Sequence, residues 1–324
     1  MLSRDRSLER KDVVAMRLSL RYATLVAAVL ATVPYVVLKA MWLAGSTVGM
    51  TGDGEAGEMS STRFVAGNVA TVAMMLIAVA FMVLLTRPRA YRLPGWLVFV
   101  LGAGATGLLA PILLGLPLGV GIQLAVRGEI KPADDTGLAP WVFGVVYSGF
   151  GVLAVAMAVS VLTYVANRWG HLLTKPPRLP SKPAVLVGAL GLLPFGSAMA
   201  WWGVRGPGGT GPQGMDQPAQ RTVLVVTGVL ALLAFAVPFL QRTTRHWPRL
   251  AWLVTWTGCC IAALQGPTQI LLAQNAEVQP GVALIGLLAV PGSCVYGLAV
   301  RRQHASTTPA PTRAFRPELA VRSD

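Results

Sequence analysis

The chain has 324 residues, of which 54% are hydrophobic and only 12% are charged. Soluble domains carry about 25% charged residues, so this composition excludes a soluble globular protein and a disordered one. A formal charge of +14 would suit a nucleic-acid-binding protein. Here the basic residues stand in short segments between apolar runs, which indicates membrane orientation and no nucleic-acid partner.

Eight apolar segments are long enough to cross a bilayer as helices, which takes about 20 residues each. None shows the polar alternation of a membrane β-strand, so we predict an all-α integral membrane bundle. The eight expected spans are 22–44, 64–86, 95–121, 140–166, 183–204, 222–240, 250–273 and 281–300. The first run follows a basic segment, as in a signal peptide. It is too long for one and lacks a small-x-small cleavage site, so we expect a retained span.

The basic residues alternate between successive connections. Twenty-one Lys and Arg residues lie before the first span, after the second, fourth and sixth spans and after the eighth, whereas five lie in the other connections. Cytoplasmic segments carry the excess of Lys and Arg, so both termini are predicted to be cytoplasmic. The amino-acid usage is typical of a GC-rich bacterial genome, and we therefore expect the bacterial cytoplasmic (inner) membrane.

Two terminal segments lie outside the spans. Residues 1–21 are predicted to form a basic cytoplasmic segment, and residues 303–324, rich in Pro, Thr, Ala and Arg, a disordered cytoplasmic tail. A basic residue close to the inner leaflet gains about 1 kcal/mol from anionic lipid. The basic segments are thus expected to contact anionic lipid, and they are where a cytoplasmic protein partner would bind.

A repeated pattern relates the two halves of the chain. In two spans a tryptophan is followed by a glycine six residues later and a proline fifteen residues later, at Trp96, Gly102 and Pro111 and at Trp252, Gly258 and Pro267. In two others a proline precedes a tryptophan by eight residues, at Pro34 and Trp42 and at Pro194 and Trp202. We predict two four-helix halves, 22–180 and 181–302, forming a parallel repeat. The alternative is coincidence, because Pro, Gly and Trp are common in membrane helices.

The four matched prolines are predicted to break their helices at corresponding depths. They are Pro34, Pro111, Pro194 and Pro267. A proline leaves a backbone carbonyl without its helical donor, and broken helices of this kind often line a cavity.

Lys39 is the one formally charged residue inside any expected span. Tyr35 and Trp42 share its helix face by i−4 and i+3 spacing. One interpretation is that the ammonium group extends to the outer interface. The other places Lys39 at the mouth of a cavity, because helical side chains lean toward the N-terminus, here the cytoplasmic side.

The seventh span is unusually polar. Gln265 and Gln269 share a face around Pro267, and Thr268 lies beside them. This face is either a polar cavity wall or a set of interhelical hydrogen bonds, which contribute well under about 2 kcal/mol each.

The sequence contains none of the usual catalytic or ligand-binding patterns. No Asp or Glu lies within an expected span, and the three cysteines and three histidines lack metal-ligand spacing. We therefore expect no catalytic residues, no metal and no cofactor, and we do not expect an enzyme.

The stretch Pro34-Tyr35, Lys39, Trp42 and Gly45 resembles the first span of uncharacterised polytopic membrane proteins from GC-rich, actinobacterium-like bacteria. The resemblance covers one span and implies no activity.

Together these patterns predict a permease-like protein with a cavity between the two halves, lined by the first, third, fifth and seventh spans. The candidate lining residues are Lys39, Tyr35, Trp42, Gln265, Gln269 and Thr268. The alternative is a membrane scaffold or regulator that recruits a cytoplasmic partner through its basic segments.

Overall fold

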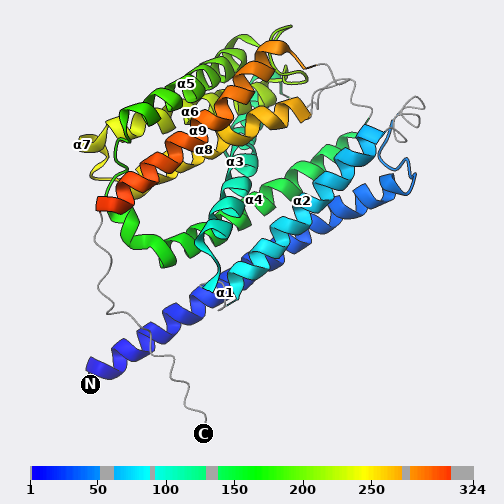
Figure 1. Ribbon diagram of the computed structural model, residues 1–324. Helices are drawn as coiled ribbons and strands as arrows, with labels where there is room; N and C mark the ends of the chain where they lie inside the picture. The colour runs from blue at the N-terminus through cyan, green and yellow to red at the C-terminus, as the bar shows by residue number, and fades with distance from the viewer. Residues whose placement is uncertain (1, 52–61, 88–91, 129–137, 272–277, 308–324) are drawn as a thin grey trace.

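The computed structural model describes residues 2–51, 62–87, 92–128, 138–271 and 278–307 (Figure 1). Within these ranges the chain is helical, and the one β-type pairing is an isolated bridge between Met50 and Leu138. The helices are α1 (Leu2–Leu43), α2 (Thr62–Thr86), α3 (Gly95–Arg127), α4 (Pro140–Trp169), η4 (Gly170–Thr174), α5 (Lys182–Arg205), α6 (Pro218–Ala236), η5 (Val237–Phe239), α7 (Gln241–Thr244), α8 (Pro248–Leu271) and α9 (Pro280–Thr307).

Seven helices in these ranges are long and apolar enough to cross a membrane. They coincide with the first six expected spans and the last one. The all-helical prediction is confirmed for the described residues, and the architecture is consistent with a multi-pass membrane protein.

The remaining expected span, 250–273, forms the helix α8, which is not among the seven. Polar residues, including Thr255, Thr257 and Gln265, lower its hydropathy. α8 packs against α3, α6 and α9, and ten of its residues are buried. These three polar side chains are buried where α8 packs against its neighbours.

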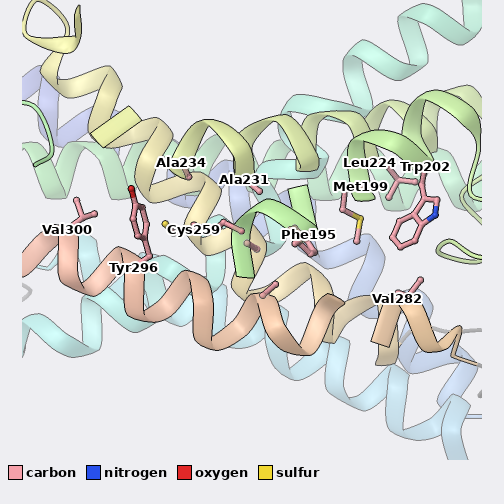
Figure 2. Packing of buried hydrophobic residues seen from close by; sticks show 13 residues of the cluster. Phe195, Met199, Trp202, Leu224, Ala231, Ala234, Cys259, Val282, Tyr296 and Val300 are labelled. Carbon is pink, nitrogen blue, oxygen red and sulfur yellow. The ribbon is translucent and has the colours of Figure 1, made fainter. Parts of the chain in front are cut away.

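Helices α5, α6, α8 and α9 form one closely packed group, which we call the large bundle core (Figure 2). Glycines allow the backbones to approach: a Cβ on Gly191 would lie 2.7 Å from the Cα of Gly292, and a Cβ on Gly266 would lie 2.5 Å from the Cα of Gly286. Larger side chains fill the remaining space, with Phe195 fully buried between the helices. Close approach through small residues is the usual mode of helix packing in membranes.

Helices α1, α2 and α4 form a second group, the three-helix unit, in which α1 packs against both partners. Thr24 Oγ1 and Ser160 Oγ lie 3.1 Å apart and share a hydrogen bond between α1 and α4. Further along the same contact, the Tyr35 and Phe150 rings meet edge to face with centroids 5.1 Å apart.

Helix α3 joins the two groups and does not complete a first four-helix half. Its N-terminal end lies against α4, where a Cβ on Gly95 would be 3.5 Å from the Trp169 ring, but it packs more extensively on α6 and α8. The 33 residues of α3 span about 50 Å at about 1.5 Å each, long enough to cross the bilayer with a tilt. Figure 1 shows α3 running from the three-helix unit to the other helices.

Helix ends that the charge pattern assigns to the same side of the membrane lie together. At the arginine-rich end, Arg168 Nη2 donates to the Leu93 carbonyl at 2.9 Å, and Trp252 Nε1 donates to the Lys175 carbonyl at 2.9 Å. This end includes α7, at the left of Figure 1. At the opposite end, Arg127 Nη1 donates to Gln217 Oε1 at 2.6 Å.

Candidate functional site

The structure brings Lys39, Tyr35 and Trp42 of α1 together, as their spacing predicts. Lys39 Nζ lies 4.5 Å from the centroid of the Trp42 ring and 5.4 Å from that of the Tyr35 ring. Lys39 is partly buried, and both aromatic residues are buried. A cation over aromatic faces gains about 0.5–2 kcal/mol, more as water is excluded. The lysine is therefore held within the protein near the end of α1.

The connection after α1 fixes the position of Trp42. Its indole Nε1 donates to the Val48 carbonyl at 2.8 Å, and the ring packs with Leu38 and with Val142 of α4. The Gly49 carbonyl accepts a hydrogen bond from the Ala139 amide at 2.8 Å, which joins this connection to the start of α4. The positions of the aromatic rings beside Lys39 are thus fixed by contacts between α1, the connection after it and α4.

Helix α2 contributes two polar residues that the sequence patterns do not single out. The Tyr35 side chain interacts with Thr71. Because α1 and α2 are antiparallel neighbours (Figure 1), Asn68 on α2, three residues before Thr71, falls near the level of Lys39 on α1. Asn68 is only 4% exposed, and within the described ranges its Nδ2 atom has no hydrogen-bond partner. The one signal in the sequence is a single amide in an otherwise apolar span.

We refer to Tyr35, Lys39, Trp42, Asn68 and Thr71 as the lysine site. It comprises one ammonium group and two aromatic rings on α1 and, on the neighbouring helix α2, a buried amide without a partner in the described part of the chain. Polar groups in a membrane-spanning segment cost free energy unless they are paired, so such a set indicates a functional site.

The polar face of α8 lies elsewhere, in the contact with α3. Gln265 is 9% exposed, and its Nε2 donates to the Gly107 carbonyl of α3 at 3.0 Å. Thr268 Oγ1 donates to the Leu264 carbonyl of its own helix at 2.7 Å, and Gln269 is partly buried one turn beyond Gln265. At Gln265 the polar face is therefore a helix–helix contact, and the structure does not bring it to the lysine site.

Each of the four matched prolines lies inside a helix that continues on both sides of it. The consequence is clearest at Pro111, which has no N–H and so leaves the Gly107 carbonyl without its helical donor. Gln265 Nε2 supplies the missing hydrogen bond from α8. The proline thus creates the acceptor by which α8 attaches to α3.

Shallow apolar grooves occur on the described part of the molecule, and two of them include no predicted lining residue. One, of about 400 Å³, lies between α1 and α4 beside Ala27 and Gly151, and the other, of about 450 Å³, lies beside Phe81 of α2 and Leu101 of α3. In the described ranges, no three His, Cys, Asp or Glu side chains are grouped to hold a metal ion.

Comparison of the chain with protein-family models, with curated proteins and with solved structures finds no match. In the described ranges the chain is all-helical, is consistent with a multi-pass membrane protein and places a lysine beside two aromatic rings in the three-helix unit.

Proposed function

We propose that the chain is a permease-like protein of the bacterial cytoplasmic membrane, with eight spans, a parallel 4+4 repeat and both termini in the cytoplasm. The one-sided distribution of Lys and Arg supports this orientation. The length and burial of α8 support an eighth crossing. No cofactor, metal or catalytic group enters the proposal.

The lysine site is the observation that carries the permease hypothesis. The Lys39 ammonium group and the Asn68 amide, which has no partner among the described residues, lie in the predominantly apolar spans Ser19–Leu43 and Val65–Thr86. Ionisable residues within membrane-spanning helices most often mark a substrate or ion pathway. The site belongs to α1 and α2, so the proposed pathway follows the three-helix unit. Gln265 then serves the packing of α3 on α8.

The packing of the helices into two groups suggests which parts of the protein could move relative to each other during transport. Glycine contacts join α3 closely to α6 and α8, whereas the three-helix unit meets α3 mainly through α4. Transporters commonly work by rocking one bundle against another around a substrate site. We propose that the three-helix unit, which carries the lysine site, moves against the remaining helices.

Efflux from proteoliposomes tests this function even while the substrate is unidentified. The full-length protein is reconstituted, the vesicles are loaded with a small-molecule extract of the producing cells, and the released solutes are identified by mass spectrometry. At least one solute should leave vesicles with the native protein and stay in vesicles with Lys39→Gln. Identical release from native, Lys39→Gln and protein-free vesicles would refute the permease hypothesis.

A membrane scaffold or regulator is the second candidate, and the length of α1 favours it. α1 has 42 residues, about 63 Å at about 1.5 Å per residue and twice the thickness of a bilayer core. Its N-terminal half extends past the other helices (Figure 1) and contains the basic segment that a cytoplasmic partner would contact. The basic tail is the second segment that a partner would contact, so deleting residues 303–324 separates the hypotheses there: a scaffold that binds through the tail should lose a cross-linked partner, whereas a permease should keep its flux.

A further inference from the structure

We propose that the lysine site binds a phosphate group, held between Lys39 of α1 and Asn68 of α2. The inference deepens the proposed function, because it names the ligand class of the same site, but it concerns binding at equilibrium and does not require transport.

Charge is the first argument. In the part of the chain that the structure describes, no ion pair involves Lys39, and its neighbours are the uncharged rings of Tyr35 and Trp42. A partly buried ammonium group without an anion is costly in a membrane-spanning helix. Aromatic faces offset part of this cost. An anionic ligand would supply the missing negative charge.

Hydrogen bonding is the second argument. The Asn68 Nδ2 atom is buried and has no hydrogen-bond partner among the residues that the structure describes, and an amide nitrogen can only donate. Thr71 Oγ1 already donates to the carbonyls of Gly67 and Asn68, and Trp42 Nε1 already donates to Val48. The site therefore offers two donors on different helices, the Lys39 ammonium group and the Asn68 amide nitrogen. A phosphate group, with several acceptor oxygens around one atom, can accept from both at once.

Depth is the third argument. Lys39 is four residues from Leu43, the last residue of α1, or about 6 Å along the axis at about 1.5 Å per residue. That places the ammonium close to the membrane surface, where Trp residues and lipid phosphates are found. The ligand can thus be a phospholipid headgroup or a small organic phosphate, and both present the same chemical group.

Arg205 provides a matched control. Its guanidinium lies 5.2 Å from the Trp201 ring at the end of α5, on the same side of the predicted membrane as Lys39. Arg205 is exposed, so the same kind of cation–aromatic pair there faces the surroundings. Arg205→Gln and Lys39→Gln remove equal charge from the same side of the molecule, and only the second alters the lysine site.

Binding is measured with the purified full-length protein in neutral detergent by isothermal titration. The probes are dihexanoyl phosphatidic acid, inorganic phosphate and hexanoate. The native protein and Arg205→Gln should bind a phosphate probe with equal affinity. Lys39→Gln and Asn68→Leu should bind it at least about tenfold more weakly, as expected for losing one hydrogen bond to a charged group. Lys39→Arg, which keeps the charge, should recover most of the affinity.

The outcomes separate the sources of phosphate and test the proposal. Binding of the lipid probe alone assigns the site to a headgroup, and binding of both phosphate probes assigns it to the phosphate group itself. Equal affinities of native, Lys39→Gln and Asn68→Leu proteins, all folded by thermal unfolding, would overturn the proposal. So would equal loss in Arg205→Gln, or hexanoate binding as tightly as the phosphate probes. A protein that binds phosphate but releases no solute from vesicles keeps this site and loses the permease function.

Discussion

Gly45 and Gly49 both follow α1, but they differ in the space that surrounds them and therefore in how well each position would tolerate a side chain. Both have positive φ angles, +86° and +81°, which L-residues rarely adopt. A Cβ at Gly45 would meet nothing within 4 Å, whereas a Cβ at Gly49 would lie 2.5 Å from Val142 Cγ2. The connection that holds Trp42 therefore depends on Gly49 more than on Gly45.

Gly45→Ala should lower the free energy of unfolding by about 1 kcal/mol, the cost of the left-handed backbone alone. Gly49→Ala should lower it by about 2–4 kcal/mol, because the overlap with Val142 adds to that cost. Chemical unfolding of both variants in the same detergent gives the comparison, with Gly45→Ala as the control. Equal costs would contradict the close contact between this connection and α4.

The pairing of Gln265 with Gly107 gives a second prediction at the residue scale. Gln265→Leu should destabilise the protein by about 1 kcal/mol, the usual size of a hydrogen bond between membrane helices. In a Pro111→Ala background the helix regains an N–H for the Gly107 carbonyl, so Gln265→Leu should then cost clearly less. A double-mutant cycle measures the difference. Additive effects would show that Pro111 does not create the acceptor.

Local spacing along one helix was enough to predict part of the lysine site. Tyr35, Lys39 and Trp42 belong to one helix face, so the i−4 and i+3 rule places them together before any tertiary structure is known. The place of Asn68 in the site and the pairing of Gln265 with the Gly107 carbonyl could not be assigned in this way. Both depend on which helices become neighbours, and neither hydropathy nor spacing encodes that choice.

At the scale of elements, α3 shows the same limit. Its expected span, 95–121, matches the start of the helix, because apolar length determines where a membrane helix lies. Its packing on α6 was not expected, because the repeat suggested a four-helix half that included α3, whereas the seventh span, α8, was expected to share a cavity with it. One face of α3 carries only small residues and a proline, which lets the backbone of another helix approach closely. These residues are Gly107, Pro111, Gly115 and Gly119. Which helix packs there depends on the shapes of both helix surfaces, and the sequence of α3 alone does not give that.

Gly119 tests the attachment of α3 to α6. A Cβ there would lie 2.5 Å from the Ala219 carbonyl oxygen, a backbone atom that cannot move independently. Gly119→Ala should lower the free energy of unfolding by about 1–3 kcal/mol. Gly121→Ala is the matched control on the same helix, since a Cβ there meets nothing within 4 Å, and it should be neutral or slightly stabilising. A neutral Gly119→Ala would contradict the close α3–α6 contact.

At the scale of the whole molecule, the large bundle core and the three-helix unit differ although the repeat predicts similar halves. Both contain corresponding pairs, α1 with α4 and α5 with α9, and in both the first helix also packs on the second. The difference concerns the third helix of each half. α8 packs on α6 and α9 of its own half, whereas α3 packs on α4 of its own half but more extensively on α6 and α8 of the other half. The pairs α1–α4 and α5–α9 are those that the predicted repeat requires, whereas the different partners of α3 and α8 do not follow from it.

The number of crossings can be decided at α8, because Thr243 precedes this helix and Gln279 follows it. If α8 crosses the membrane, Thr243→Cys is cytoplasmic and Gln279→Cys is outside. A membrane-impermeant maleimide should then label Gln279→Cys and Thr47→Cys in intact cells, and Thr243→Cys and Ser181→Cys only after permeabilisation. None of these substitutions removes a basic residue, so the charge pattern that sets orientation is unchanged. If Gln279→Cys, like Thr243→Cys, is labelled only after permeabilisation, then seven helices cross the membrane and α8 does not. The parallel repeat would then also be refuted, because a half with three crossings reverses direction.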